Sequence, residues 1–520
     1  MHRQPADLVI ENVLVITMDS KRPEATGIAV YNGKIVGLLE NNDSPWPLTQ
    51  NGRLINGQGM TLLPGLIDAH CHLRAQISQY QSVQCTHPDV HSIEDIIRLL
   101  RAKATTVEKG TWIRAIGYDS FYLQEKRHPT RRDLDCATQQ HPIRLRHITR
   151  HVSVLNSKAL EIAGIGPDSI DPPGITVERE SKSGVPTGII YGGDAWLTQN
   201  FVSPLSSDEL RIGAHKLHQE LLSNGITSVQ DATPSNTLFD LKFWKDNISK
   251  YWNISISLMS NIDHHPTLQE YHSKETVLES INKLKIGPIK VVMENNPDLV
   301  PSPDDLRKIA LEAAKRNIPL AIHTVTPEMI WSAIDAIQYA KDTIPNKLVN
   351  RLEHLSLCPE SFLADLADLN MIVVTNPGFI YDHGDRYIND VDPTEHSWLY
   401  RMKSLQDYGI PLAAGSDAPV ATANPWIAIA TACYRHTRSN KAFSPDEKLN
   451  RWNALELYTT NAALAGGWEM ERGMIRPDFQ ADFILVNHHP LSCSLENLYQ
   501  MQVQQTWIDG ILVYEKQREY

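Results

Sequence analysis

The stretch Leu62–His72, with the sequence LLPGLIDAHCH, is an apolar run that ends in two histidines separated by one residue. In a β-strand, side chains alternate between the two faces, so His70 and His72 should point in the same direction. Two convergent imidazoles suit a borderline-soft divalent cation such as Zn²⁺. The pair alone is weak evidence for a metal site, and its weight depends on what the rest of the chain supplies.

Three later residues repeat this arrangement, because His323, His354 and Asp417 each close a short strand-like run. Taken singly, each is equally well explained as a hydrogen-bonded buried histidine or a capping aspartate. Taken together, their placement is typical of the catalytic rim of a barrel, where the ends of the strands meet. Four strand ends that supply nitrogen and carboxylate ligands therefore predict a catalytic metal centre.

The order of the predicted elements indicates an α/β fold. Helical patterns separate most of the strand-like runs, and Ser302-Pro303 is a sound signal for a helix that starts at Asp304. After the His70 strand, the predicted strands are 225–231, 254–259, 289–294, 319–325, 348–355, 371–375 and 410–416. Eight strands alternating with helices predict a closed (β/α)₈ TIM barrel with its active site at the carboxyl ends of the strands. A doubly wound open sheet is the alternative, but no glycine-rich turn follows the first strand.

Both ends of the chain read as short strands joined by turns. Asn32-Gly33 and Asp509-Gly510 are strong hairpin signals, because these residue pairs accept the positive φ angles of a type I′ turn. We expect a small β-sandwich domain built from residues 1–61 and 471–520, which flanks a barrel over residues 62–470. Residues 74–222 are predicted to form an insertion after the first barrel strand, and this insertion should cap the catalytic face.

Length and composition limit the class of protein. At 520 residues, the chain is long enough for one large domain and a smaller one, and its 42% apolar and 21% charged residues are ordinary for a globular protein. The net charge of −12 argues against nucleic acid or an anionic membrane as partner. There is no long apolar run, no secretory signal at Met1 and no C-x-x-C pair among the cysteines, so we expect a cytoplasmic protein.

Several motifs carry a resemblance to a known family. They are LPGLIDAHCH at 63–72, HVSVLNSKAL at 151–160, RLEH at 351–354, GSDAP at 415–419 and YTTNAA at 458–463. This set resembles the amidohydrolase superfamily, and specifically the amidohydrolase family 3 branch of proteins similar to N-substituted formamide deformylase. The resemblance extends over nearly the whole chain, including the β domain made from both ends.

The resemblance implies a metal-dependent hydrolase with one or two divalent ions per chain, for which we expect zinc. The ligands that it implies are His70, His72, Lys290, His323, His354 and Asp417. His70, His72 and Asp417 would bind the more buried ion, and His323 and His354 the second. Lys290 stands at the end of the fourth strand, where the superfamily often carries a carboxylated lysine that bridges two ions. The alternative for Lys290 is an ordinary lysine in an ion pair.

The resemblance also implies a mechanism. Metal coordination lowers the pKa of water from about 15.7 towards 7, and the resulting hydroxide attacks a carbonyl carbon that the second metal or His151 polarises. Asp417 takes the proton and returns it to the leaving nitrogen, first as base and then as acid. For His151, a structural role in the cap is the equally weighted alternative.

The predicted function is hydrolysis of a non-peptide C–N bond in an amide or formamide-like small molecule, by a protein that the resemblance suggests is a homodimer. Deamination or ester hydrolysis on the same metal site remains open, because the same hydroxide serves all three reactions. A non-catalytic assembly protein with a barrel fold is the alternative from another class, although every expected ligand position is filled.

Two segments, residues 293–298 and 323–328, depart from the pattern of many relatives. Residues 376–398 are predicted to form a long loop that shapes specificity or is simply solvated.

Overall fold

The computed structural model describes residues 3–41, 44–172, 175–202, 204–274, 283–295 and 298–517. The chain forms two compact units: Met1–Leu73 together with His218–Tyr520, and Arg74–Leu217. The second unit falls within the stretch 74–222 that the sequence marks as an insertion. Among the described residues, no helix combines the length and the apolar character needed to span a bilayer.

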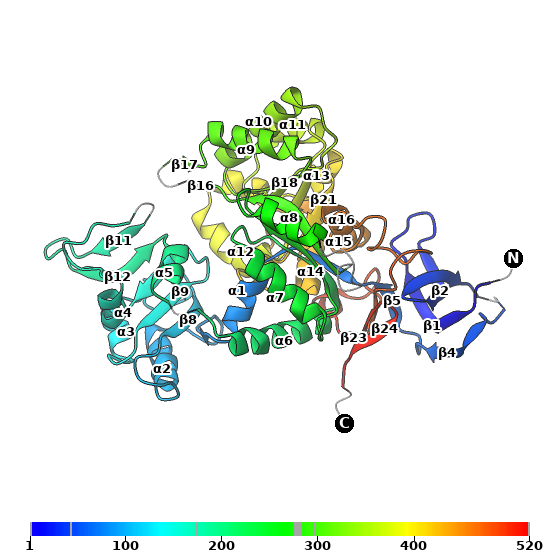
Figure 1. Cartoon of the computed structure of the whole chain (residues 1–520), viewed down its shortest axis with the longest axis horizontal. Coiled ribbons are helices and arrows are strands. Elements are labelled where there is room, and N and C mark those ends of the chain that lie inside the picture. Colours follow the sequence, from blue (N-terminus) through cyan, green and yellow to red (C-terminus); the bar gives the residue numbers. More distant parts are fainter. Residues whose placement is uncertain are drawn as a thin grey trace. The chain divides into compact units, whose positions relative to one another are not determined.

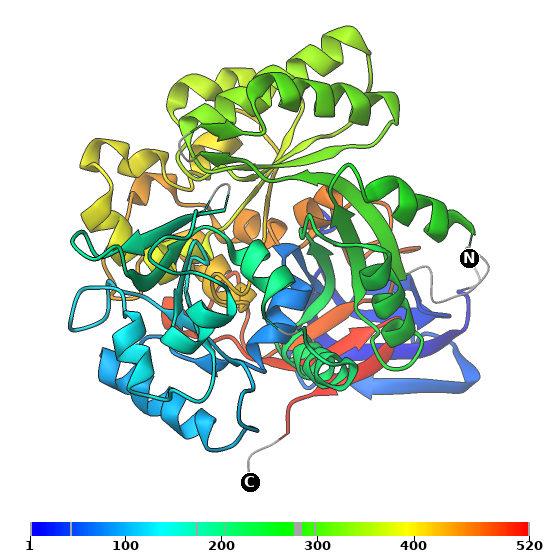
Figure 2. The ribbon, with the colours of Figure 1, turned by 60° about the vertical axis from the view of Figure 1, so that its left-hand side comes forward.

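Eight parallel strands form the central sheet of the first unit, in the order β21-β20-β19-β18-β15-β14-β13-β6. They are β6 (Leu66–Cys71), β13 (Ile226–Asp231), β14 (Ser255–Ser260), β15 (Leu284–Val291), β18 (Leu320–Thr324), β19 (Arg351–His354), β20 (Ile372–Thr375) and β21 (Leu412–Ala414). Each overlaps the run predicted for it, and consecutive strands are neighbours, as a barrel requires and a doubly wound sheet does not. The predicted barrel is therefore confirmed as a nearly closed eight-stranded parallel sheet (Figure 2).

Helices connect these strands or follow the last of them, as Figure 1 shows. They are α7 (Leu238–Ile248), α8 (His265–Lys274), α9 (Pro303–Lys315), α10 (Pro327–Thr343), α11 (Leu363–Asp368), α12 (Gly378–Asp390), α13 (Lys403–Asp407), α14 (Pro425–Tyr434), α15 (Arg451–Glu456) and α16 (Thr460–Ala465). The start of α9 confirms the predicted helix signal, because the Ser302 side chain accepts from the backbone N–H of Asp305 and Pro303 occupies the first turn.

The barrel closes where the chain just after β21 meets β6. The backbone N–H and hydroxyl of Ser416 donate to the Asp68 carboxylate at 3.0 and 2.6 Å, and the Asp417 N–H donates to the His70 carbonyl at 2.7 Å. Only glycine fits at position 415, because a Cβ there would lie 2.4 Å from the His70 Cβ. The motif Gly415-Ser416-Asp417 therefore joins the last strand to the first and brings Asp417 beside the two histidines.

Side chains of the buried strand β6 alternate between two environments. Ile67 and Ala69 pack outward in an apolar cluster with α16, which contributes Ala462, Ala463 and Ala465. Asp68 and His70 point the other way and make polar contacts with residues of other barrel strands. This alternation explains why a strand without solvent exposure carries both an apolar set and a polar set.

The two ends of the chain form one mixed sheet in the order β24-β23-β22-β5-β1-β2-β3, with β4 added to β1 (Figure 1). Its strands are β1 (Ala6–Ile16), β2 (Glu24–Tyr31), β3 (Lys34–Leu39), β4 (Leu48–Asn56), β5 (Thr61–Pro64), β22 (Phe483–Val486), β23 (Val503–Ile508) and β24 (Ile511–Glu515). Both predicted hairpin turns are present, with φ of 49° and 74° at Asn32-Gly33 and 52° and 71° at Asp509-Gly510. The sandwich packing of this domain stays a prediction. Its sheet extends slightly beyond the predicted boundary at residue 61, because β5 ends at Pro64.

The second unit contains a six-stranded sheet in the order β11-β12-β10-β9-β8-β7. Its strands are β7 (Val83–Gln84), β8 (Ile113–Tyr118), β9 (Ile143–His147), β10 (Val152–Leu155), β11 (Thr176–Arg179) and β12 (Pro186–Tyr191). Its helices are α1 (Leu73–Gln79), α2 (Ile93–Ala104), α3 (Arg131–Asp135), α4 (Ser157–Ile162), α5 (Asp194–Asn200) and the start of α6 (Ser207–Ser223). An apolar cluster with Ile96, Leu100 and Leu145 gives this unit a core of its own.

One predicted loop is wrong, because residues 376–398 form mainly the helix α12 and the 3₁₀ segment η3 (Pro393–Trp398). Tertiary packing accounts for the difference. Phe379 and Ile380 are buried with Leu399 and Tyr400 in an apolar cluster. Gly384 is required by close packing, since a Cβ there would lie 2.7 Å from the Thr437 side chain.

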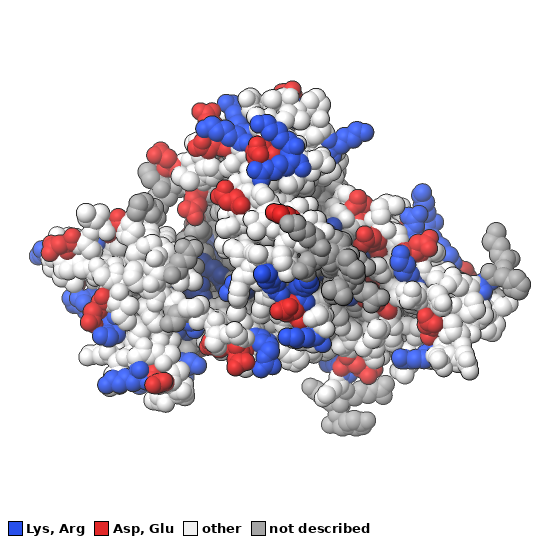
Figure 3. Space-filling view, in the orientation of Figure 1, with Lys and Arg blue, Asp and Glu red and all other residues white. Residues whose placement is uncertain are grey.

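Charged side chains of both signs are interspersed on the outer helices α9 and α10 (Figure 3). Arg307 on α9 pairs with Asp335 on α10 through Nε at 2.7 Å, and Lys308 pairs with Asp305 one turn away at 2.8 Å. Such mixed pairs add little stability when exposed, but they leave these helices without an extended field of one sign.

Candidate metal centre

Three predicted ligands meet at the carboxyl ends of the first and last barrel strands. The Asp417 Oδ1 lies 3.5 Å from the Nε2 of His70 and 3.0 Å from the Nε2 of His72. These candidate ligand atoms all lie within 4.8 Å of one another. Two ligand atoms at about 2.1 Å from a tetrahedral ion are about 3.4 Å apart, so this spacing matches a single zinc-sized cation.

The other ring nitrogen of His72 fixes which tautomer this side chain adopts. Its Nδ1 lies 3.0 Å from the Thr233 Oγ1, and that hydroxyl donates its own proton to Asp231 at 2.6 Å. The Thr233 oxygen must therefore accept from an Nδ1–H of His72. In neutral His72, the Nε2 that faces Asp417 then carries a lone pair and no proton.

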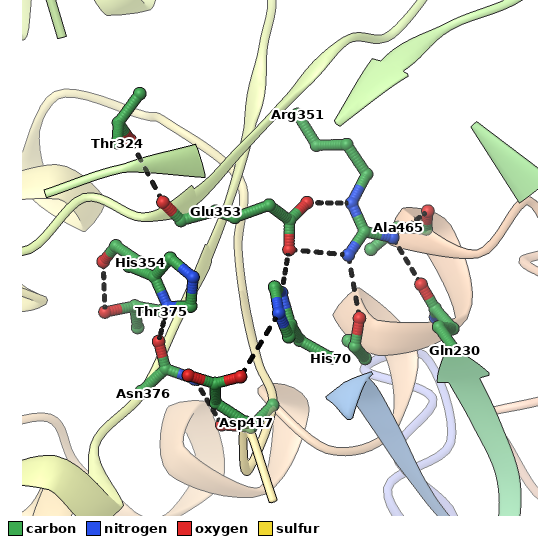
Figure 4. A network of polar contacts seen from close by, with 12 residues as sticks. His70, Gln230, Thr324, Arg351, Glu353, His354, Thr375, Asn376, Asp417 and Ala465 are labelled. Atoms are coloured by element: carbon green, nitrogen blue, oxygen red, sulfur yellow. Dashed lines mark hydrogen bonds and ion pairs between the residues drawn. The ribbon is translucent and has the colours of Figure 1, made fainter. Parts of the chain in front are cut away.

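His70 and His354 are held in the same way (Figure 4). The Nδ1 of His70 contacts the Glu353 carboxylate, which can only accept, so His70 also donates from Nδ1. The Nδ1 of His354 lies 2.7 Å from the Asn376 Oδ1, while the amide nitrogen of Asn376 donates to the Gly415 carbonyl at 2.8 Å. Metal-binding histidines commonly use the second nitrogen in this way, which orients the ring and leaves Nε2 free for the ion.

The site thus collects acceptors without a donor between them. The Nε2 of His70 is buried and has no hydrogen-bond partner among the described residues. Lone pairs of His70 and His72 and a carboxylate oxygen of Asp417 repel one another unless a cation stands among them. The donor set of two imidazoles and a carboxylate suits a divalent ion such as Zn²⁺, so the residues present fit the metal that the sequence predicts.

His323 and His354 lie next to this triad. The ring of His354 is centred 4.7 Å from that of His70 and 4.6 Å from that of His323. His354 and Asp417 have φ of 69° and 54°, a left-handed conformation that costs a non-glycine residue about 1–3 kcal/mol and is often found at functional sites. The structure therefore brings all four histidines and Asp417 to one end of the barrel.

Lys290 lies on β15 and is fully enclosed in the same barrel. Its Nζ is buried and has no hydrogen-bond partner among the described residues. Burial lowers the pKa of Lys290 to about 8, against the opposing effect of Glu353 and Asp417. A fraction of this amine is therefore uncharged near neutral pH, which is the form that carboxylation by CO₂ requires.

Burial also governs the charge of the candidate ligands. It lowers the pKa of His70 to about 3 and holds the pKa of His323 and His354 below the ordinary value, with Lys290 adding to each shift. Burial alone would raise the pKa of Asp417, but the contact with His72 and the nearby histidines lower it below its usual range. At neutral pH His70, His323 and His354 are therefore neutral and Asp417 is ionised, the protonation states that bind metal.

His151 is the one predicted site residue outside this unit. It precedes β10 in the second unit, its side chain is exposed, and its carbonyl accepts from the Gly192 N–H at 2.8 Å. The structure describes the two units separately, so its catalytic role stays a prediction. Of the departing segment 293–298, residues 296 and 297 lie outside the described part of the chain.

Sequence reasoning assigned no role to Asp68, Thr233, Glu353 and Asn376, although each contacts a ligand or its backbone. Asp68 and Glu353 were detectable in principle, because each stands on an inward-facing position of a strand that also carries a ligand. Thr233 and Asn376 lie just after strands β13 and β20. A neutral polar residue in such a place is too common for the sequence alone to single it out.

Comparisons with known proteins show which family the chain belongs to. A family model described as amidohydrolase family matches residues 53–514. N-substituted formamide deformylase from Arthrobacter pascens is 27% identical over 99% of both chains, and Protein LONG AFTER FAR-RED 3 from Arabidopsis thaliana is 26% identical over 93% of this chain and 87% of its own. The crystal structure of an uncharacterized metal-dependent hydrolase from Pyrococcus horikoshii superimposes with a TM-score of 0.73 at 20% identity, over 94% of this chain and 99% of the other. Because the family model spans most of its length, the chain belongs to the amidohydrolase family.

Proposed function

We propose that this protein is a metal-dependent hydrolase that cleaves a non-peptide C–N bond in an amide or formamide-like small molecule. The observation that carries the proposal is the convergence of His70 Nε2, His72 Nε2 and Asp417 Oδ1 without a donor among them. Membership of the amidohydrolase family supports the hydrolase class. Similarity over 99% of both chains to an enzyme named N-substituted formamide deformylase supports the proposal that the cleaved bond is a non-peptide C–N bond.

In this proposal, His70, His72 and Asp417 hold one divalent ion, for which we expect zinc. His323 and His354 would hold a second ion, and Lys290, in a carboxylated form, would supply oxygen ligands to the ions. When bound, such an ion supplies a Lewis acid that lowers the pKa of water from about 15.7 towards 7. The chain itself must keep the imidazoles correctly oriented, and the contacts of their Nδ1 atoms support that role.

Asp417 is the group in position to move a proton. Its carboxylate is ionised at neutral pH, because its pKa lies below the usual range, so it can accept a proton as water adds to the carbonyl carbon. The same group then donates that proton to the nitrogen as the C–N bond breaks. For a formamide the products are formate and an amine, and the atoms of one water molecule are divided between them. We propose His151 as a second group that polarises the carbonyl. A cytoplasmic location and a homodimer remain predictions.

The reaction is tested with the purified full-length chain, loaded with Zn²⁺ after treatment with a chelator. A panel of N-alkyl and N-aryl formamides, aminopurines and simple aryl esters is offered, and formate, ammonia and released phenol are measured separately. The proposal expects equal amounts of formate and amine, lost on chelation and restored by Zn²⁺. Ammonia from an aminopurine alone would assign a deaminase, phenol alone would assign an esterase, and no turnover with any loaded metal would contradict the enzyme.

A further inference from the structure

Arg351 on β19 is buried beneath the candidate metal centre, with 1% of its side chain exposed. All of its N–H groups are directed at acceptors: Nε to Glu353 at 2.6 Å, Nη2 to Glu353 at 3.0 Å and to the Ala69 carbonyl at 2.7 Å, and Nη1 to Gln230 and, at 3.1 Å, to the Ala465 carbonyl (Figure 4). A guanidinium offers five N–H donors, so this one is fully used. It joins β6, β13, β19 and α16 at a single point.

Glu353 stands between this arginine and the ligand His70. Its Oε1 accepts from Arg351, and its Oε2 accepts both from Arg351 and from the Nδ1–H of His70. Glu353 has no exposed surface, so water cannot replace either partner. The Arg351 guanidinium thus balances the charge of the carboxylate and also determines where its two oxygens point.

We propose that Arg351 and Glu353 are positioning residues that keep His70 in the Nδ1–H tautomer and fix the direction of its Nε2 towards the metal. The inference rests on the proposed function, because it concerns metal binding at the same site. Glu353 acts on the imidazole ring of His70, since an ionised carboxylate accepts a hydrogen bond from Nδ1–H but cannot donate one. Arg351 acts on the backbone as well, since it holds the carbonyl of Ala69, the residue that precedes His70.

The hydrogen-bond geometry explains why position 353 needs a carboxylate and not an amide. In Glu353→Gln, an amide nitrogen at the Oε1 position would face the N–H of Arg351 Nε, which puts two donors together. An amide nitrogen at the Oε2 position would face Arg351 Nη2 and would donate to His70 Nδ1. That second arrangement moves the imidazole proton to Nε2, where it blocks the metal. Either orientation of the amide therefore disturbs the chain of contacts from Arg351 through Glu353 to His70, which we call the relay.

The test uses the full-length chain with Glu353→Gln, with the double variant Arg351→Met/Glu353→Leu, and with Asp482→Asn as control. The double variant removes both charges of a buried pair, which proteins often tolerate, so it remains informative if the single variant folds poorly. Asp482 forms a comparable buried pair with Arg472 and contacts none of the candidate ligands. Zn²⁺ affinity is measured by competition with a chromophoric chelator, the visible spectrum after Co²⁺ substitution reports ligand geometry, and thermal unfolding reports folding.

Both relay variants should bind Zn²⁺ about 10–100-fold more weakly than the wild type and show an altered Co²⁺ spectrum. Asp482→Asn should lower the unfolding temperature but keep the wild-type affinity and spectrum. If the wild type binds metal and the relay variants match it in affinity and spectrum, the relay is wrong and the proposed function stands. A wild type that binds neither Zn²⁺ nor Co²⁺ would overturn both.

Discussion

Replacing Gly415 with alanine should damage the metal centre although residue 415 is not a candidate ligand. Position 415 lies where the end of the last barrel strand passes directly against His70 on the first strand. A Cβ there would lie 2.4 Å from the Cβ and from the backbone nitrogen of His70. Contacts of this kind involve backbone, which cannot rotate away as a flexible side chain does.

The size of the effect follows from these distances. Ordinary van der Waals contact begins at 3.4 Å, so the two strands must separate by 3.4 − 2.4 = 1.0 Å. Asp417 follows two residues later, and such a shift lengthens its 3.0 and 3.5 Å separations from His72 and His70 towards about 4.0 and 4.5 Å. An ion with bonds of about 2.1 Å cannot bind Asp417 together with His70 and His72 at tetrahedral angles when the ligand atoms lie that far apart. We therefore expect metal affinity to fall by at least about 10–100-fold, with a loss of about 1–3 kcal/mol in the free energy of unfolding from overpacking.

The assay compares wild type, Gly415→Ala and the matched control Gly166→Ala. At Gly166 an added Cβ has no neighbour within 4 Å, so this variant introduces the same methyl group without a clash. Zn²⁺ affinity is measured by chelator competition, and stability by urea unfolding. If Gly415→Ala binds Zn²⁺ as tightly as Gly166→Ala does, closure of the barrel does not position Asp417 and the reasoning fails.

Three further outcomes are expected. Asp417→Asn should lower kcat by about 10²–10⁴, and an unchanged kcat on the best substrate of the panel would remove Asp417 from proton transfer. Lys290→Ala should reduce bound metal from about two ions per chain to about one, as measured by plasma mass spectrometry, whereas an equal metal content would argue against a lysine bridge. Because burial holds the pKa of His70, His323 and His354 below the ordinary value of about 6.5, protons compete with metal at these rings only at lower pH. Zn²⁺ affinity, corrected for the chelator, should therefore fall less steeply between pH 7.5 and 5.5 than the fall of about 10³ expected for three unshifted histidines, and a fall of that size would refute the shifts.

The barrel could be predicted because local sequence and tertiary structure agree there. Each barrel strand is a short apolar run, and each predicted ligand stands at the end of such a run, where parallel strands bring side chains together. The hairpins at Asn32-Gly33 and Asp509-Gly510 could be predicted because the turn itself selects the residues.

Other parts depend on contacts between distant segments and could not be predicted. The helix α12 is stabilised by burial of Phe379 and Ile380 against Leu399 and Tyr400, which no local pattern reveals. The relay from Arg351 through Glu353 to His70 joins residues 283 positions apart in the sequence at its last step. Strand alternation could place Arg351 and Glu353 on one face, but not the ligand that they meet.

The central claim is that His70, His72 and Asp417 bind a divalent ion. Its most direct test is a crystal structure of the Zn²⁺-loaded full-length chain, with anomalous diffraction data collected on both sides of the zinc absorption edge. The claim predicts an anomalous peak, present only above the edge, at about 2.0–2.2 Å from His70 Nε2, His72 Nε2 and an Asp417 carboxylate oxygen. A fully loaded protein with no peak among these three atoms, or with its zinc bound elsewhere, would contradict it.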